Sequence, residues 1–302
     1  MKKIAITMCA LLIVLSGCKG KETTPSAGSP AKQTLVIGLI PEQNIFKQIE
    51  KYTPLADYLS EKLGLKIQLK ILARYGNIIN NFQSERMDGA FLGSFTGALA
   101  HSKLGLEFIA RPENLNGIST YRGLIFVRKD SGINKAGDMK GKIFAFVDKA
   151  TTAGYLLPLA YFKMNGIRDY KKYLKETYFS GTHEDVIRDV LNRKADIGAA
   201  KDTVYYRIAQ SDRGILDELS LLEKSPEVPE NALVLRKDMD NKIKKRLKEL
   251  LLNMHNDPEG EKILKTFGAR KFIETTINDY EPVFKYAREI GLDLATYDYL
   301  ND

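Results

Sequence analysis

The sequence predicts an α/β protein with two similar lobes, each a mixed sheet flanked by helices, joined by two hinge crossings. Short apolar runs alternate with segments whose apolar residues recur at helical spacing, and this alternation occurs twice along the chain. Such an order is typical of α/β domains with a largely parallel sheet. The 302 residues are enough for two domains of ordinary size, and the hydrophobic fraction of 44% is normal for a globular protein.

The first unit begins with an apolar run at 35–40, which ends at Pro41 and is typical of a buried strand. Residues 45–63 follow with apolar side chains at helical spacing, and Gly64 provides a helix stop. The alternation continues with strands predicted at 66–73, 88–93, 106–111 and 121–128, and helices at 75–84 and 94–104.

The second unit repeats this order after a first crossing near 127–131. Its predicted strands are 142–147, 173–179 and 195–199, and its predicted helices are 152–165, 183–193 and 202–210. The segments Asp88-Gly89-Ala90 and Asp196-Ile197-Gly198-Ala199 occupy equivalent places in the two units, which indicates two lobes of similar build.

A second crossing near 223–231 contains two prolines and returns the chain to the first unit. Strands are predicted on either side of it at 219–222 and 232–236, followed by helices at 238–255, 258–267 and 279–289. Two crossings insert the second unit into the first. We therefore expect a first lobe of residues 34–128 plus 226–302 and a second lobe of residues 129–225.

The N-terminus looks like a bacterial lipoprotein signal. A basic start precedes an apolar core at 4–15, which is too short to span a bilayer comfortably, and Leu15-Ser16-Gly17-Cys18 resembles a lipobox. We expect residues 1–17 to be a signal peptide and Cys18 to carry the lipid that anchors the protein outside the cytoplasm. Residues 18–33 have the composition of a flexible tether. The alternative is an ordinary signal peptide with an incidental cysteine.

Charge and cysteine content narrow the class of partner. Removing Lys2 and Lys3 with the signal lowers the net charge from +8 to about +6, which suits an anionic ligand or membrane surface. No Lys/Arg cluster interleaves with aromatic residues, so we expect no nucleic-acid partner. Both cysteines, Cys9 and Cys18, precede the folded body, which therefore holds no disulfide.

Candidate binding residues follow the predicted strands, because ligands of open α/β sheets bind outside the carboxyl ends of strands. They are Gln43, Tyr75, Ser94, Thr151, Thr152, His183, Lys201 and Asp202. The segment 148–155 is central among them, since it joins a strand to a helix whose free N–H groups and dipole attract an anion. Each residue also has a structural alternative: Thr151, Thr152, His183 or Asp202 as a helix cap, Tyr75 as a core aromatic, and Lys201 as an exposed side chain.

Signals of catalysis are absent from the sequence. His101 and His255 have no partners at metal-ligand spacing, and we find neither a Gly-x-Ser-x-Gly elbow nor a Gly-rich nucleotide loop. We expect no metal, no cofactor and no enzymatic activity.

Several segments, in this order, resemble phosphate/phosphite/phosphonate-binding proteins of ABC importers. They are the lipobox, 54–59, 88–94, 121–133, 148–158, 181–184 and 224–226, and the likeness covers most of 35–270. The resemblance implies a type II periplasmic binding protein fold that closes on its ligand like a hinge. It also implies an oxyanion pocket in which Thr151 and Thr152 supply hydroxyls, Gly154 allows close backbone approach, and His183 and Tyr75 line the ligand.

Three positions depart from the family pattern. Ala153 replaces a second serine, Leu92 replaces a tyrosine found in some members, and Asn231 stands near where binders of aminophosphonates carry an acid. The last change argues against 2-aminoethylphosphonate as the ligand. We expect a monomeric, lipid-anchored binding protein that captures a small oxyanion and presents it to an ABC permease. The alternatives are a sensor that signals to a membrane protein, a binder of another small organic anion, or an enzyme on the same fold.

Overall fold

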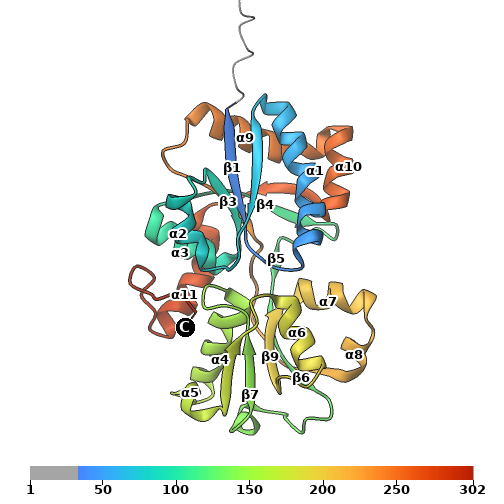
Figure 1. Ribbon diagram of the computed structural model, residues 1–302, viewed down its shortest axis with the longest axis vertical. Coiled ribbons are helices and arrows are strands. Elements are labelled where there is room, and N and C mark those ends of the chain that lie inside the picture. The colour runs from blue at the N-terminus through green and yellow to red at the C-terminus, as the bar shows by residue number, and fades with distance from the viewer. Residues whose placement is uncertain (1–32, 302) are drawn as a thin grey trace, which may run out of the picture. The chain divides into compact units, whose positions relative to one another are not determined.

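The computed structural model describes residues 33–301, which form two lobes, each built on its own sheet (Figure 1). The predicted signal peptide, Cys18 and almost all of the tether lie outside the described residues. No helix within 33–301 is long and apolar enough to cross a membrane.

The first lobe contains a six-stranded sheet in the order β13-β4-β12-β3-β1-β2. Its strands are β1 (Thr34–Leu39), β2 (Lys66–Ile71), β3 (Gly89–Leu92), β4 (Glu107–Asn114), β12 (Ala232–Leu235) and β13 (Ala269–Glu274). The strands β1, β2 and β3 are parallel, whereas β12 runs antiparallel to both β3 and β4, so the sheet is mixed.

The second lobe contains a five-stranded sheet in the order β10-β6-β9-β7-β8. Its strands are β6 (Gly123–Arg128), β7 (Ile143–Phe146), β8 (Glu176–Phe179), β9 (Ile197–Lys201) and β10 (Leu219–Lys224). Here β7 is parallel to β8 and β9, while β6 is antiparallel to β9 and β10. The mixed sheets confirm the predicted fold class.

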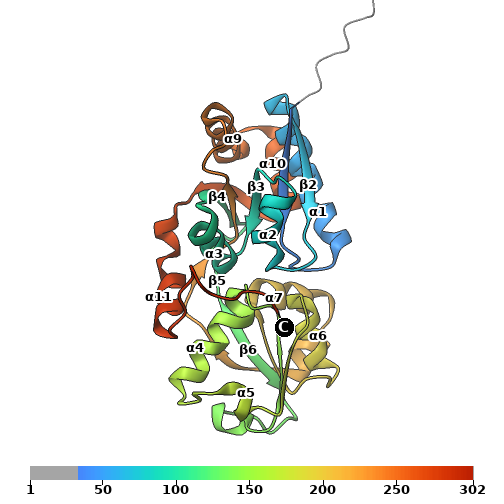
Figure 2. The ribbon, with the colours of Figure 1, turned by 60° about the vertical axis from the view of Figure 1, so that its left-hand side comes forward.

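Helices cover the sheets of both lobes (Figures 1 and 2). Those of the first lobe are α1 (Ile45–Leu63), α2 (Asn77–Ser84), α3 (Ser94–Leu104), α9 (Asn241–Asn253) and α10 (Pro258–Phe267), with the short turns η3 (Met254–Asn256) and η4 (Ile277–Tyr280). Those of the second are α4 (Leu157–Met164), α5 (Tyr170–Tyr173), α6 (His183–Leu191), α7 (Asp202–Ser211) and α8 (Gly214–Glu218), with η1 (Ala136–Met139) and the π-helical turn η2 (Thr152–Leu156).

The longest of these helices, α1, shows why the local sequence folds as it does. The Asn44 side chain accepts a hydrogen bond from Phe46 N and so caps the helix start, and Gly64 ends the helix in the left-handed region. Tyr52, Leu55 and other apolar residues on one face are buried against the first sheet.

The predicted boundary between the lobes is wrong at its first crossing. We expected 121–128 to belong to the first lobe, but β6 lies between β9 and β10 in the second sheet. Every residue of β6 is buried, and a buried apolar run indicates a strand without indicating which sheet the strand joins. The chain crosses instead at β5 (Thr120–Tyr121), which pairs with β11 (Val228–Pro229) of the returning crossing.

The C-terminal segment contacts both lobes rather than the first alone. It follows α11 (Glu281–Glu289), which lies beside the lobes in Figure 2. On the first lobe, Lys103 Nζ donates to Ala295 O at 2.8 Å. On the second lobe, Tyr297 Oη donates to Lys149 O at 2.9 Å, and Asn301 Nδ2 donates to Asp148 Oδ2 at 3.0 Å.

Candidate functional site

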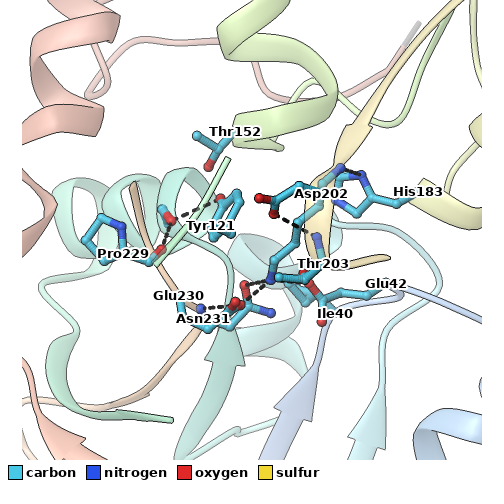
Figure 3. Close-up of polar contacts among 12 residues, drawn as sticks. Ile40, Glu42, Tyr121, Thr152, His183, Asp202, Thr203, Pro229, Glu230 and Asn231 are labelled. Carbon is cyan, nitrogen blue, oxygen red and sulfur yellow. Dashed lines mark hydrogen bonds and ion pairs between the residues drawn. The ribbon is translucent and has the colours of Figure 1, made fainter. Parts of the chain in front are cut away.

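The candidate site lies where the carboxyl ends of the parallel strands of both lobes meet. From the first lobe come the segments that follow β1, β2 and β3, and from the second come those that follow β7, β8 and β9. Figure 3 shows side chains from these segments together with residues of the two crossing strands. Two groups of residues occupy this junction: an oxyanion pocket candidate around Thr152 and a charged cluster around Lys201.

The turn after β7 is held by its own polar groups. Asp148 Oδ1 accepts a hydrogen bond from Ala150 N at 2.8 Å, and Thr151 Oγ1 donates to Asp148 O at 2.7 Å. The Thr151 side chain therefore does not cap the following helix, which removes the structural alternative for this residue. A Cβ atom added to Gly154 would lie 2.4 Å from Val147 Cβ, so this glycine lets the π-helical turn pack on the end of β7.

Thr152 connects the turn to the first lobe. Its Oγ1 accepts a hydrogen bond from Phe95 N, at the start of α3, at 2.8 Å. Beside it, Thr96 Oγ1 donates to Ala150 O at 2.7 Å. Ser94 Oγ donates to Pro229 O at 2.6 Å and lies 3.0 Å from the Tyr121 hydroxyl, so it is tied to both crossing strands. The lobes therefore meet directly at the predicted anion site.

His183 is a buried, neutral hydrogen-bond donor. Its Nδ1 accepts a hydrogen bond from Lys201 N at 3.2 Å, which leaves the ring hydrogen on Nε2. Burial lowers the pKa of His183 to about 3, so the ring is uncharged at neutral pH. The cap of α6 is Thr182, whose Oγ1 accepts from Asp185 N, so His183 is not needed as a cap.

Tyr75 packs edge-on against His183, with 6.0 Å between the ring centroids. It is almost fully buried, and its hydroxyl finds no hydrogen-bond partner among residues 33–301. Burial raises the pKa of Tyr75 well above its ordinary value, so the hydroxyl keeps its hydrogen. A buried donor without a partner costs about 1–3 kcal/mol, and such a group points to a bound ligand.

Lys201 forms the centre of a charged cluster that sequence reasoning did not find. Its Nζ lies 3.1 Å from both Glu42 Oε1 and Asn231 Oδ1, contacts Glu230 Oε1, and stands 4.4 Å from the centroid of the Tyr121 ring. The lysine side chain is only 4% exposed. The prediction named Lys201 but weighed it as an exposed lysine, and the structure contradicts that alternative.

Charge attraction outweighs desolvation in this cluster. Burial lowers the pKa of Lys201, but the carboxylates of Glu230 and Glu42 raise it by more, so the net pKa lies above its ordinary value. Burial likewise raises the pKa of Glu42, and Lys201 reverses this to give a pKa of about 2. Lys201 and Glu42 are therefore both charged at neutral pH.

Gln43 and Asp202 lie at the edges of the junction. Gln43 lines a cavity of about 420 Å³ that opens beside the Lys201 cluster, together with Lys51, Arg207 and others. Asp202 begins α7, where its Oδ1 accepts a hydrogen bond from Thr203 N at 2.7 Å, and burial raises its pKa. The structure thus gives Asp202 a role at a helix start. No group of three His, Cys, Asp or Glu residues within the described part of the chain could hold a metal ion.

Comparison with known proteins shows that the chain matches one protein family. Residues 37–280 match a family described as "ABC transporter, phosphonate, periplasmic substrate-binding protein". The phosphonates-binding periplasmic protein of Escherichia coli (strain K12) is 25% identical over 256 residues, which cover 82% of this chain and 74% of the relative.

Solved structures show the same fold. A binding protein component of an ABC phosphonate transporter from Pseudomonas aeruginosa superposes with a TM-score of 0.79 at 22% identity, covering 86% of this chain and 87% of the other. PhnD1 from Prochlorococcus marinus (MIT 9301), solved in complex with methylphosphonate, gives a TM-score of 0.76 at 22% identity, covering 85% and 98% of the two chains.

Proposed function

Because the chain belongs to the family of ABC transporter phosphonate periplasmic substrate-binding proteins, we propose that it captures a small phosphorus oxyanion between its lobes. The ligand class comprises phosphonate, phosphite and phosphate, and the captured anion is handed to a membrane permease. The family is one of binding proteins, and the site described above contains no nucleophile paired with a base.

The observation that carries this proposal is the unpaired hydroxyl of Tyr75 beside other hydrogen-bond donors. Tyr75 Oη has no partner among the described residues, and neighbouring His183 carries its hydrogen on Nε2. The Thr151 hydroxyl already donates to Asp148 O, but Thr152 adds a hydroxyl at the start of a helical turn, where backbone N–H groups and the dipole favour an anion. These groups are neutral donors, so an oxyanion can be bound without a cation against it.

Contacts between the lobes support capture by closure. The turn that carries Thr152 bonds directly to the start of α3, through Thr152 to Phe95 N and through Thr96 to Ala150 O. A ligand held by donors of both lobes favours the arrangement in which these contacts form. Ser94 supports this arrangement through its bonds to the crossing strands, and Gln43 lines the cavity beside the Lys201 cluster.

A thermal-shift panel on residues 34–302 tests the proposal. The ligands are phosphate, phosphite, methylphosphonate, 2-aminoethylphosphonate, sulfate and sulfonates. A ligand present at about 100 times its dissociation constant stabilises the protein by about 2.7 kcal/mol. We expect a shift with at least one phosphorus oxyanion and none with sulfate.

The matched variants are Thr152→Val and Thr276→Val. Thr152 accepts the Phe95 N–H through its hydroxyl, whereas Thr276 precedes η4 and lines a different cavity. We expect the shift to disappear in Thr152→Val and to persist in Thr276→Val. No shift with any phosphorus oxyanion in the wild-type protein would contradict the proposed ligand class.

The membrane anchor belongs to the same proposal. We propose that Cys18 carries a lipid and that the body acts as a monomer, because one chain supplies both halves of the pocket. Metabolic labelling with an alkynyl fatty acid should mark the full-length protein, and Cys18→Ala should lose both the label and the membrane fractionation. Labelling that survives Cys18→Ala would exclude this anchor.

A further inference from the structure

We propose that Lys201 is a built-in ammonium ion: it fills a cation cage beside the oxyanion pocket and thereby selects anions that carry no amino group. This inference deepens the proposed function and rests on it for the identity of the anion. The existence of the cage does not depend on it, because the cage is defined by contacts within the chain.

The groups around Lys201 Nζ are those that recognise an alkylammonium ion. Two carboxylates, from Glu42 and Glu230, and the amide oxygen of Asn231 accept its hydrogen bonds. The face of the Tyr121 ring lies 4.4 Å from the nitrogen, within the range of a cation–π interaction. Oxygen acceptors and an aromatic face thus enclose a cation that is 4% exposed.

Glu230, one of the two carboxylates of the cage, is held in place by contacts that do not involve the lysine. Glu230 N donates to Ser119 O, and Tyr280 Oη donates to Glu230 O, each at 2.9 Å. Lys201 enters this frame from the end of β9 in the second lobe, whereas Glu42 follows β1 of the first lobe. Because Asn231 N also donates to Glu230 Oε1 at 3.0 Å, Glu230 and Asn231 keep their places at the cation position if the lysine side chain is shortened.

The cage adjoins the oxyanion pocket through shared residues. Figure 3 shows Tyr121 between Thr152 on one side and Glu230 and Asn231 on the other. The Tyr121 hydroxyl meets Ser94 near Thr152, while its ring faces Lys201. A zwitterion with its anion at Thr152 would therefore extend its ammonium toward the position that Lys201 holds. The lysine excludes that ligand by occupying the place and by placing a like charge there.

The first experiment removes the end of the Lys201 side chain by mutation and replaces it with a free amine. Lys201→Ala removes three methylene groups and the ammonium, which are the atoms of the propylammonium ion. We expect propylammonium chloride to raise the melting temperature of Lys201→Ala in a saturable manner, with no such rise for 1-propanol. The wild-type protein should not respond, because its cage is filled.

Lys62→Ala is the matched control. Lys62 Nζ also stands over a tyrosine ring, 5.1 Å from the Tyr58 centroid, and lies 3.0 Å from Asp257 Oδ2, but its side chain is 31% exposed. We expect no rescue there. If Lys201→Ala does not fold, the double variant Lys201→Ala/Glu230→Gln has one carboxylate fewer without a partner, and it should show a weaker rescue by the same amine.

The second experiment measures ligand preference by calorimetry. Wild-type protein should bind methylphosphonate at least about tenfold more tightly than 2-aminoethylphosphonate, and Lys201→Ala should reverse this order. Amine rescue without binding of either phosphonate would leave the cage standing and overturn only the proposed function. Methylphosphonate binding by wild type, with neither rescue nor reversal in the variants, would overturn the cage.

Discussion

The junction between the lobes has two halves, the charged cluster around Lys201 and the oxyanion pocket candidate around Thr152. They differ in whether their buried polar groups find partners within the protein. Around Lys201, every charge meets an opposite charge or an oxygen acceptor within the chain. Around Thr152 and His183, the groups are neutral donors, and the Tyr75 hydroxyl has no partner within residues 33–301. Burial penalises a polar group unless it is paired. The first half is therefore complete in the protein alone, whereas we propose that a ligand completes the second.

The largest effect expected from this comparison is on the complete half. Lys201→Met keeps the length of the side chain but leaves Glu42 and Glu230, each only 18% exposed, without their cation. Breaking a buried pair in this way costs about 3–5 kcal/mol. We expect the free energy of unfolding in urea, measured without ligand, to fall by that amount.

Two control variants test this prediction. Lys62→Met breaks an ion pair whose two side chains are each 31% exposed, so it should lower the free energy of unfolding far less than Lys201→Met does. Adding Glu42→Gln and Glu230→Gln to Lys201→Met should recover most of the loss, because no charge then stays unpaired. A Lys201→Met protein as stable as Lys62→Met would show that the cluster is open to water.

Thr152→Val tests the hydrogen bond between the oxyanion pocket candidate in the second lobe and α3 in the first lobe. The valine removes the acceptor of Phe95 N, so we expect a loss of about 1–3 kcal/mol in unfolding free energy without ligand. Saturating methylphosphonate should widen the gap to the wild-type protein, because the ligand also loses a hydroxyl. A gap that is the same with and without ligand would limit Thr152 to holding the lobes together.

His183 gives the incomplete half a dependence on pH. Its pKa in the folded protein is about 3, below the ordinary 6.5, so below pH 6.5 the unfolded chain takes up a proton that the folded ring does not. Stability from this group is therefore full above pH 6.5 and falls as the pH drops toward 3. Relative to His183→Gln, the wild-type protein should lose up to about 1.4 kcal/mol per pH unit between pH 6 and 4.

Asp148 also titrates in this pH range, but its contribution to stability is the same in the wild-type protein and in His183→Gln. Burial raises the pKa of Asp148 to about 6, so its folded carboxyl binds a proton more readily than the unfolded one, and stability from it rises as the pH falls through 6. Both proteins contain Asp148, so its contribution cancels in their difference. Parallel pH profiles for wild type and His183→Gln would mean that the ring is solvated in the folded protein.

The residues that gather at the junction could be predicted from the sequence, but the ion pairs between them could not. Residues after strands, such as Thr152, His183 and Lys201, do gather there, because the carboxyl ends of parallel strands share one edge of each sheet. The cluster of Lys201 with Glu42 and Glu230 joins residues from three distant parts of the chain, and no local pattern encodes such a contact. Its one local sign is an acid directly after the Pro41 that ends β1.

The same distinction explains the misplaced boundary. Burial of both faces of a strand leaves a continuous apolar run, which is what 124–127 shows, and the run looks the same in either sheet. The partners of β6 are β9 and β10, which both come later in the chain; β9 pairs from Gly123 with Lys201 to Val127 with Ile197. Sheet membership is thus a property of two segments together and cannot be predicted from either alone.

The smallest effect expected is at Tyr75, and it separates the two halves most directly. Tyr75→Phe deletes a hydroxyl that has no partner among the described residues, so stability without ligand should stay the same or rise by up to about 1 kcal/mol. Tyr58→Phe, which loses the bond to Asp257 Oδ2 at 2.9 Å, should instead lower it by about 1 kcal/mol. With methylphosphonate the order reverses: Tyr75→Phe should bind about tenfold more weakly in calorimetry, and Tyr58→Phe as tightly as wild type. Should Tyr75→Phe cost as much as Tyr58→Phe without ligand, the hydroxyl has a partner in the protein itself, and both halves of the junction are complete on their own.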